Sequence, residues 1–498
     1  MRFTLPFILI SIAVLVSSCR KDFDTIPSYG NLEFSKDTVF LDTIFSNIGS
    51  ATYNLKVYNK SNKAITVPEI KLENGVNSNY RLNVDGTPGK EFKDITILAN
   101  DSIYVFVETT IDFSSITDPL YTDKILFDNG NKQQDVDLVT LVQDAHFIFP
   151  SKNSLGIETL TIDGKDSEIQ GRFLKDDELT FTDEKPYVIY GYAAVPSTKT
   201  LTINPGARIH FHRNSGLIID KDASLKASGT LDKKIVFEGD RLEHQFDNIT
   251  GQWGTIWLRA NSKKNELNHT IIKNGIVGML VDGITPSSPT LTIKNSEIYN
   301  SSSYGILARN SNIVGENLVI GNTGQSSLAC TFGGIYNFTH ATFGNYWNNS
   351  LRQLPAVLVN NHTTYVNQDD EKITEIRDLS EATFTNCIID GNNNIEFLLD
   401  KIDGTLFNYS VKNCLIKFDD VNKTYSNIPE LQFNNSTHYQ NVTLNGLSDF
   451  KNPQKNELII GENSDAINKG IITPSTFDIT GNERLNNIDL GAYQHMKF

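Results

Sequence analysis

The sequence has few cysteines, no long run of basic residues, and no His and Cys residues at zinc-site spacing. It holds four cysteines in 498 residues, and the three in the body of the chain are too sparse for a disulfide framework. A formal net charge of −15 argues against an electrostatic grip on nucleic acid. No nucleophile elbow, P-loop or dinucleotide-binding fingerprint occurs. We therefore expect no metal site, no cofactor and no nucleic-acid partner.

The apolar run near the N-terminus is too short to cross a membrane. It reads LPFILISIAVLV over residues 5–16, which suits the core of a signal peptide. The stretch VSSC at 16–19 resembles the processing box of bacterial lipoproteins, and the resemblance implies cleavage before Cys19 and acylation of its thiol. Residues 20–24, RKDFD, resemble the surface-export signal of Bacteroidota lipoproteins, although Phe23 interrupts the acidic pair. An ordinary signal peptide with a coincidental cysteine is the alternative.

The interpretation as a lipoprotein places the chain on a membrane. Several acyl chains on Cys19 would hold a protein there stably, whereas a single chain would not. We expect a monomer anchored by lipid to the outer membrane or the cell surface of a Gram-negative bacterium. Residues 1–18 would then be the signal peptide and residues 19–30 a tether.

Short alternating strands dominate residues 31–145. In YNLKVYN (53–59) and SIYVFVETTI (102–111) apolar residues alternate with others, as in strands that bury one face. About seven such strands, separated by turn-forming residues, predict a β-sandwich. The segment resembles the disulfide-free immunoglobulin-like modules of secreted bacterial proteins, which implies a spacer role. Residues 146–177 are polar and are expected to form a linker.

A repeat organises residues 178–463, where no amphipathic-helix period is convincing. Its form is Asn or His, two residues, then a large apolar residue, and successive copies start 26, 22, 23, 46, 27 and 28 residues apart. The copies are HTIIKN (269–274), NSEIYN (295–300), NLVIGN (317–322), HATFGN (340–345), NCIIDG (386–391), NCLIKF (413–418) and NVTLNG (441–446).

The repeat predicts the fold of the second domain. Period-two alternation within each copy indicates a strand, and the recurrence indicates one such strand in every coil of a solenoid. We predict an all-β chain whose body, residues 178–463, is a right-handed parallel β-helix. The 46-residue step is twice 23, so we expect it to hide one coil with its strand at 355–361. The polar residues 362–381 should loop outside the coils.

Stacking of equivalent positions, about 4.8 Å apart, assigns roles to single columns. The starting Asn and His column is expected to form a hydrogen-bonded ladder. Cys387 and Cys414 fall on one small inward site of adjacent coils and should be buried thiols, with a cross-coil disulfide left open. The tail, residues 464–498, is expected to cap the last coil, because a solenoid end is otherwise a bare sheet edge.

The tail also resembles the C-terminal signature of bacterial right-handed β-helix proteins. It reads SDAINKG (464–470), DITGNER (478–484) and DLGAY (489–493), departing from the signature at Asp465, Asn468 and Gln494. The coil beginning GQWGTIW at 251 resembles the W-G-x-I coil of the same proteins. They include the choice-of-anchor Q group and pectate-lyase-like enzymes such as lyases shaped like chondroitinase B. The resemblance implies a β-helix and, by fold analogy, a polysaccharide partner.

The outward columns offer candidate site residues. Polysaccharide lyases on this fold need a base and a group that neutralises a uronate. Lys273, Glu297 and Tyr299 should lie together on neighbouring coils, and Asp282 and Arg309 at equivalent positions of the next strand. A sugar could stack on Tyr299 while Lys273 and Arg309 meet a carboxylate or sulfate. The alternative is ordinary Lys–Glu and Asp–Arg pairing between coils.

Two further clusters of polar residues are candidate sites. His210 and His212 in RIHFHR could be half of a metal site, or surface and capping histidines. GDRLEHQ (239–245) gathers Asp240, Arg241 and Glu243, but a glycosidase needs two opposed carboxylates, whose separation the sequence does not fix. Two functions stay open: a β-helix that binds glycan or serves as an adhesion surface, and a polysaccharide lyase or glycoside hydrolase acting on an acidic polysaccharide.

Overall fold

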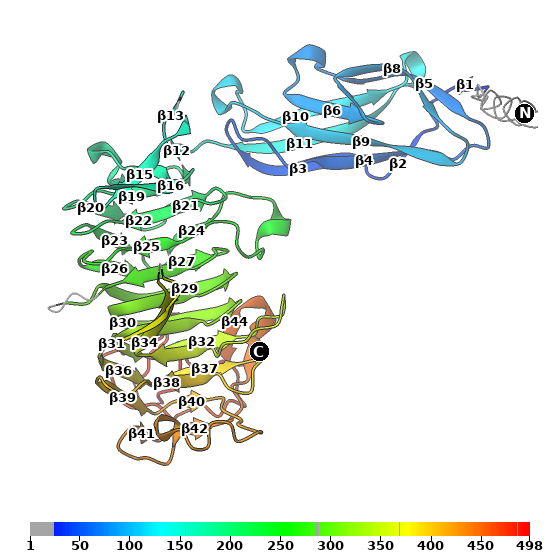
Figure 1. Cartoon of the computed structure of the whole chain (residues 1–498). Coiled ribbons are helices and arrows are strands. Elements are labelled where there is room, and N and C mark those ends of the chain that lie inside the picture. Colours follow the sequence, from blue (N-terminus) through cyan, green and yellow to red (C-terminus); the bar gives the residue numbers. More distant parts are fainter. Residues whose placement is uncertain (1–23, 155, 284–287, 368, 486) are drawn as a thin grey trace, which may run out of the picture. The chain divides into compact units, whose positions relative to one another are not determined.

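The computed structural model describes residues 24–154, 156–283, 288–367, 369–485 and 487–498. The predicted signal peptide, Cys19 and the start of the tether lie outside the described residues. The chain divides into two compact units, the first ending at Asp144 and the second beginning at Ala145 (Figure 1). In the described part of the chain, no helix is long and apolar enough to cross a membrane.

The first unit consists of two sheets that share one core. One sheet contains, in spatial order, β1 (Ile26–Pro27), β5 (Ile65–Leu72), β10 (Leu120–Phe127), β11 (Gln134–Gln143) and β3 (Thr38–Phe45), with β8 (Glu91–Ile97) beside β5. The other contains β2 (Glu33–Phe34), β4 (Tyr53–Asn59), β9 (Asp101–Thr109), β6 (Tyr80–Val84) and β7 (Thr87–Gly89). In β9 the residues Ile103, Val105 and Val107 are buried in that core. The unit is therefore a β-sandwich, and its immunoglobulin-like character stays a prediction.

The second unit is a parallel β-helix with three faces, which we call A, B and C in the order in which each coil visits them. Face A contains β12 (His146–Ile148), β18 (Tyr187–Ile189), β21 (Arg208–Phe211), β24 (Ile235–Gly239), β27 (Thr270–Lys273), the ends of β29 (Leu291–Ser301) and β30 (Ile306–Thr323), β32 (Thr342–Asn345), β37 (Ile388–Gly391), β40 (Leu415–Ile416) and β42 (Thr443–Leu444). Face B contains the end of β16 (Lys165–Phe173), β19 (Tyr192–Val195), β22 (Gly216–Ile219), β25 (Ile256–Leu258), β28 (Met279–Asp282), the starts of β30 and β31 (Leu328–Thr339), β33 (Val357–Asn360) and β38 (Phe397–Asp400). Face C contains β17 (Thr180–Phe181), β20 (Thr200–Ile203), β23 (Ser224–Ser228), β26 (Asn265–Asn268), the start of β29, the middle of β30, the end of β31, β36 (Leu379–Thr385), β39 (Phe407–Lys412) and β41 (Tyr439–Gln440).

The repeat marks the strand of face A in successive coils. Its large apolar column is in parallel register from Ile272 through Ile298 and Ile320 to Phe343, and then on to Ile389. These side chains are fully buried in the core of the β-helix. The all-β fold and its parallel coils are thus confirmed, and right-handed winding stays a prediction.

The Asn and His column forms the turn from face C to face A. Each member is a single residue in left-handed backbone, with φ of 48° at His269 and Asn295 and 53° at Asn386. Asn tolerates that conformation better than most residues, which explains its recurrence. The predicted ladder is present in part, because Asn317 Nδ2 donates to Asn295 Oδ1 at 2.9 Å and Asn386 Nδ2 donates to His340 Nε2 at 3.0 Å. Asn295 Nδ2 instead donates at 2.9 Å to Asn268, the neighbour of the column residue His269.

The two stacked cysteines are buried free thiols, as expected. Cys387 and Cys414 are both fully buried, and the Cys387 amide donates to Cys414 Sγ at 3.4 Å. Burial raises the pKa of the Cys414 thiol. Because both side chains are fully buried, they act as small apolar core groups.

The expected linker is wrong, because residues 146–177 belong to the β-helix. β12 pairs with β18 in parallel, and the end of β16 pairs with β19. β15 (Thr159–Ile162) and β16 form a hairpin whose Leu160 packs on Ala194 and Ile218 of face B. β12, β15 and β16 have only one buried residue each, so the sequence reads as polar although the first coil has begun.

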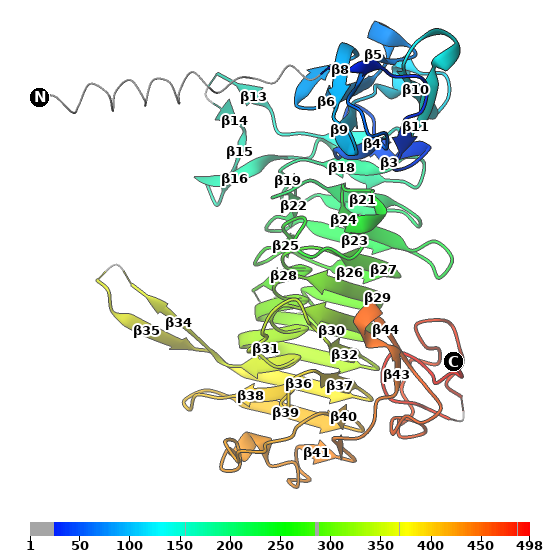
Figure 2. The ribbon, with the colours of Figure 1, turned by 90° about the vertical axis from the view of Figure 1, so that its right-hand side faces the viewer.

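The hidden coil is also absent. β32 pairs directly with β37, so the 46-residue step is one long coil, whose strand β33 lies on face B. The extra residues include an antiparallel hairpin of β34 (His362–Val366) and β35 (Lys372–Ile376). This hairpin projects away from the coils (Figure 2), as expected for residues 362–381.

The tail does not cap the last coil but lies along face A. It hydrogen-bonds the Asn and His column coil by coil: Asn413 Nδ2 donates to the Lys469 carbonyl at 2.7 Å, Asn386 Nδ2 to the Ile471 carbonyl at 2.8 Å and Asn317 Nδ2 to the Phe477 carbonyl at 2.9 Å. Figures 1 and 2 show this segment beside the strands of face A.

Apolar residues in an outward column of face A explain why the tail packs there. Ile388 and Leu415 are buried against Ala466 and Leu490 of the tail, and Val319 is buried against Ile479 and Ala492. The core under the last coil is instead closed by aromatic residues after β40, namely Phe418, Tyr425, Phe433 and Tyr439.

Candidate functional site

The predicted residues on face A do not form an open site. Lys273 Nζ lies 2.7 Å from Glu238 Oε2, and Glu297 accepts from Lys234 Nζ at 2.6 Å. Tyr299 is only 8% exposed, packs with Tyr493 of the tail and donates to Glu297 Oε2 at 2.8 Å. Burial raises the pKa of Tyr299. Stacking of a sugar on Tyr299 is therefore wrong, because the tail already covers that ring.

The predicted residues on the next strand lie on another face. Asp282 and Arg309 are in register on β28 and β30, as expected, but this is face B and not face A. Arg309 Nε donates to Asp282 Oδ1 at 2.6 Å, and Trp257 Nε1 donates to Asp282 Oδ2 at 2.8 Å. The hydrogen bond with Asp282 raises the pKa of Arg309. The pair is mutually satisfied, and Arg309 does not join Lys273 in one site.

The two histidines separate in the structure. His210 is 4% exposed, so a surface position is wrong, and its Nδ1 lies 3.2 Å from the Gly239 carbonyl. Burial lowers the pKa of His210 and favours the neutral ring. Within the described ranges, no group of three or more His, Cys, Asp or Glu is placed to hold a metal ion.

His212 instead ends a stack of aromatic rings on face A, which we call the aromatic ladder: Phe149, Tyr190 and His212. Each residue follows directly after its strand, and β12, β18 and β21 are adjacent and in register. The ring centroids of Phe149 and Tyr190 are 5.0 Å apart, and those of Tyr190 and His212 are 4.3 Å apart. Phe149 is 49% exposed and the His212 side chain 46% exposed, so the stack forms a partly open aromatic wall.

Two hollows lie against this wall, and together we call them the ladder groove. One, of about 420 Å³, is lined by Phe149, Tyr190 and His212 with Ile157, Gln170 and Arg213. The other, of about 320 Å³, is lined by His212 and Arg213 with Asp240, Arg241, Phe246 and Gln252. They share His212 and Arg213, so they adjoin along the stacking direction of the coils. Aromatic walls with a few convergent polar groups are typical of ligand sites.

The polar groups of the groove are held in place by neighbours. Asp240 Oδ2 lies 2.7 Å from His212 Nδ1, and Arg241 donates two hydrogen bonds to Glu243, at 3.0 and 2.8 Å. Burial, and after it the Asp240 carboxylate, raises the pKa of Tyr190 to about 12. The Tyr190 phenol therefore stays protonated at neutral pH and remains a hydrogen-bond donor.

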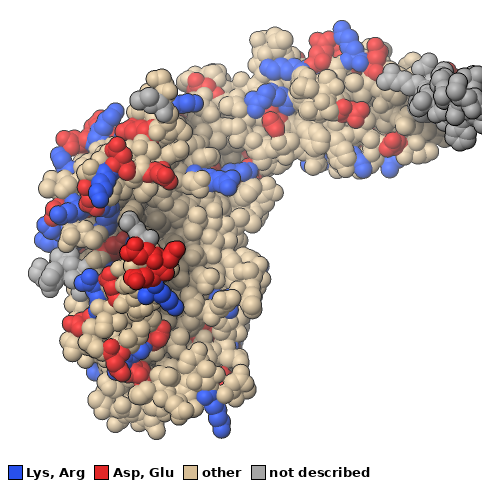
Figure 3. All heavy atoms as spheres, in the orientation of Figure 1, with Lys and Arg blue, Asp and Glu red and all other residues tan. Residues whose placement is uncertain are grey.

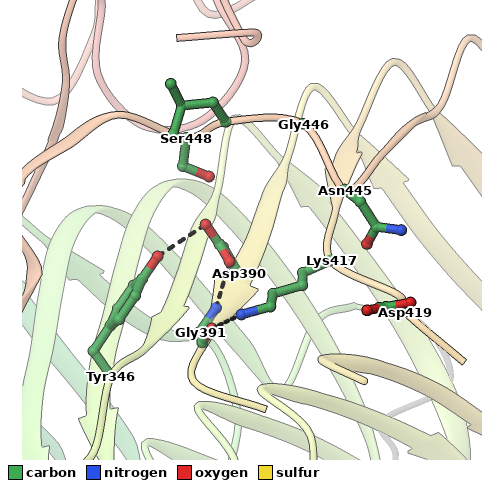
Figure 4. A pocket seen from close by; sticks show the side chains of 9 residues that line it. Tyr346, Asp390, Gly391, Lys417, Asp419, Asn445, Gly446 and Ser448 are labelled. Atoms are coloured by element: carbon green, nitrogen blue, oxygen red, sulfur yellow. Dashed lines mark hydrogen bonds between the residues drawn. The ribbon is translucent and has the colours of Figure 1, made fainter. Parts of the chain in front are cut away.

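A third hollow lies at the far end of face A. It measures about 630 Å³ and is lined by Tyr346, Asp390, Lys417, Asp419, Asn445 and Ser448 (Figure 4). Tyr346 donates to Asp390 Oδ2 at 2.8 Å, and Figure 4 shows Asp390 and Asp419 on either side of Lys417. Burial raises the pKa of Tyr346. Asp390, Lys417 and Asn445 belong to the outward column that also holds Lys273 and Tyr299, so the sequence contained the signal for this pocket.

The sequence signal for the ladder groove was weaker. In the sequence, His212 is recognisable only as half of a possible metal site, and no motif singles out Tyr190. Phe149 fell in the expected linker, because β12 is three residues long. Only the register of β12 with β18 brings the rings together. Over the β-helix face in view, acidic and basic side chains are interspersed (Figure 3).

Comparisons with known proteins add little to this geometry. No protein-family description matches the chain, and no curated protein is similar enough to count as a match. The catalytic unit of a GH87 alpha-1,3-glucanase from Streptomyces thermodiastaticus is 13% identical, with 73% of this chain and 74% of that one covered and a TM-score of 0.24. A family 123 glycoside hydrolase from Clostridium perfringens is 14% identical, with 22% of this chain and 25% of that chain covered and a TM-score of 0.16. This chain thus spans a quarter of the latter, and neither likeness carries an argument about function.

Proposed function

We propose that the protein binds an extended glycan in the ladder groove. The observation that carries this proposal is the partly exposed stack of Phe149, Tyr190 and His212 between two adjoining hollows. Sugar rings present apolar C–H groups that pack on aromatic side chains, while their hydroxyls need donors and acceptors. Gln170 and Arg213 supply such groups on the groove walls.

The groove suits a polymer better than a small compact ligand. The two hollows follow one another along the coils, with His212 and Arg213 at the junction. The rungs of the wall repeat at coil spacing, about 4.8 Å in a parallel sheet. A chain molecule lying along the coil axis would therefore contact several rungs at once, and many weak contacts would add up to useful affinity.

The test is binding of a panel of neutral and acidic polysaccharides by affinity electrophoresis. Tyr190→Ala and Phe149→Ala are each expected to weaken binding at least tenfold, which corresponds to about 1.4 kcal/mol. Tyr190→Phe keeps the ring and should retain most binding. Tyr365→Ala removes a tyrosine of the hairpin that is 45% exposed, close to the 49% of Phe149, and should leave binding unchanged. If Tyr190→Ala and Phe149→Ala both bound a polysaccharide as tightly as the parent protein does, the proposal would be refuted.

A hydrolase or lyase is the second candidate function, and one observation favours placing it in the pocket of Figure 4. Asp390 and Asp419 offer two carboxylates beside Lys417 and Tyr346, and glycosidases use carboxylate pairs. Incubation of the same polysaccharides, followed by size-exclusion chromatography, tests it. If the protein shortened a polymer and Asp390→Asn or Asp419→Asn abolished this activity, the protein would be an enzyme. If all polymers stayed intact, glycan binding would be the one function supported.

We also propose that Cys19 is acylated and that the mature protein is a monomer on the outer membrane or cell surface. The support is the VSSC stretch at 16–19 and the apolar run before it. The mass of the N-terminal peptide of the mature protein tests acylation, because each added acyl chain changes that mass by a defined amount.

A further inference from the structure

The charged side chains around the ladder groove are not balanced. Asp240 is engaged by His212 at 2.7 Å, and Arg241 is paired with Glu243 at 2.8 Å. Two cations remain, Arg213 and Lys152, and neither side chain has a hydrogen-bond or ion-pair partner among the described residues. Arg213 lines both hollows, and Lys152 lines the larger one. The groove therefore has an excess of positive charge in a chain whose formal net charge is −15.

Three other cations on the same face have partners within the chain. Lys234 is bound to Glu297 at 2.6 Å and Lys273 to Glu238 at 2.7 Å. Further down face A, Lys417 donates to the Gly391 carbonyl. Arg208 of β21 has no side-chain partner among the described residues, but it does not line either hollow. Arg213 and Lys152 are thus the cations without a partner in the described chain that border the groove.

We propose that the glycan bound in the ladder groove is anionic and that Arg213 contacts its charged group. This inference rests on the proposed function and names the class of ligand. A guanidinium presents a planar fork of N–H donors that matches a carboxylate or a sulfate with two parallel hydrogen bonds. The aromatic wall beside Arg213 lowers the local polarity, which strengthens the attraction relative to open water. Lys152 adds a second positive charge to the lining of the larger hollow.

The position of Arg213 also defines how the ligand lies. It stands at the junction of the two hollows, directly after His212 in the chain. A charged group held there would place the sugar on one side against Tyr190 and Phe149. The sugar on the other side would lie near Phe246 and Gln252. Uronates and sulfated sugars offer the same anionic oxygens, so the shared chemistry is an acidic glycan.

The experiment compares dextran with dextran sulfate, which has the same backbone with sulfate esters on its hydroxyls, and adds polygalacturonate as a carboxylate polymer. Affinity electrophoresis and calorimetry are done with the purified protein. We expect dextran sulfate or polygalacturonate to bind at least tenfold more tightly than dextran and the difference to shrink as salt is raised. Preference for one acidic polymer over the other identifies the anionic group as sulfate or carboxylate.

Variants of Arg213 make the test specific. Arg213→Gln should remove most of the preference for the charged polymer, and Arg213→Lys should restore it only in part, because the fork is lost. Arg81→Gln removes an exposed arginine from the first unit, with its side chain 49% exposed, and should change nothing. Circular dichroism confirms that each variant is folded.

The possible failures are distinguishable. Binding of dextran and dextran sulfate with equal affinity, lost in Tyr190→Ala but not in Arg213→Gln, would overturn the charge preference and leave the proposed function standing. A preference for the acidic polymers that Arg213→Gln leaves intact would likewise overturn the role of Arg213. Absence of binding to every polymer would overturn both proposals.

Discussion

Face A behaves differently at its two ends. Over the first coils its aromatic ladder borders open hollows, whereas over later coils its outward apolar residues are covered by the tail. The strands are of the same kind and continuous in register. An apolar residue in an outward column of face A can therefore have one of two roles. It packs against the chain's own tail, or it is available to a ligand. The aromatic ladder has no such cover among the described residues.

The difference also separates two kinds of candidate residue. Tyr299 is aromatic and lies in an outward column, which suits a ligand site. It is nevertheless buried against Tyr493 of the tail, in the contact between face A and the C-terminal residues that cover it, which we call the seam. Phe149 is aromatic, outward and 49% exposed. A site hypothesis on a β-helix thus has to ask first where the ends of the chain pack.

The largest expected effect comes from breaking the covered end. Leu458 is 1% exposed and lies over Gly321 and Gly344, where an added Cβ would sit 3.1 and 2.8 Å from its methyl carbons. Leu458→Ala should lower the free energy of unfolding by about 2–5 kcal/mol, since it leaves a cavity in a packed seam. Urea denaturation measures this.

A matched control is Ile472→Ala, because Ile472 also lies in the chain after the last coil but is 87% exposed, and we expect a change within about 0.5 kcal/mol. Glycan binding should be the same in both variants. Equal stabilities of the two variants would mean that Leu458 does not pack on face A.

A smaller effect concerns acid. Burial, and then the positive charge of Arg484, lowers the pKa of His340 to about 3, and Asn386 Nδ2 donates to its Nε2 at 3.0 Å. The unfolded chain binds a proton at this side chain near pH 6.5 while the folded chain does not, so stability falls as pH drops below about 6.5. His340→Asn, which restores the commonest residue of the column, should flatten that fall by about 1–2 kcal/mol between pH 7 and pH 5.

Thermal or urea unfolding at several pH values measures the slope. An unchanged slope in the variant would show that His340 is not kept neutral under the tail. Because only the covered end carries this histidine, the result also reports on the seam without reference to the groove.

The smallest effect is expected at the predicted site residue Lys273. Its ion pair with Glu238 is partly exposed, with side-chain exposures of 27% and 23%, so Lys273→Ala should cost at most about 1 kcal/mol. Polysaccharide binding should not change, because Lys273 lies outside both hollows of the groove. A tenfold loss of binding in this variant would support the site predicted from the sequence at Lys273. It would contradict the conclusion that the ligand binds at the aromatic ladder.

The fold was largely predictable because the repeat has a local cause. One left-handed residue per coil, Asn or His, fixes where each strand of face A begins, and short-range pattern is enough to find it. The course of the tail was not predictable in this way. Its hydrogen bonds with Asn386 and Asn317 join residues 85 and 160 positions apart.

The candidate site was less predictable for a similar reason. Phe149 and Tyr190 come together through the pairing of His146 with Tyr187, and β12 is too short to be recognised from its pattern. The sequence did contain Asp390, Lys417 and Asn445 as one outward column, but it gave no reason to prefer that end over Lys273 and Tyr299. The deciding information was which part of the column the tail leaves open.

The seam between tail and coils also sets an order of events during synthesis. The coils that carry Val319, Ile388 and Leu415 leave the ribosome before the residues that cover them, Leu458, Ile479 and Leu490. Until synthesis is complete, these coils expose an apolar surface to solvent, and incomplete chains aggregate through exposed apolar surfaces. Truncation from the C-terminus would thus do more than remove a few contacts, because it would leave this apolar surface of face A permanently exposed.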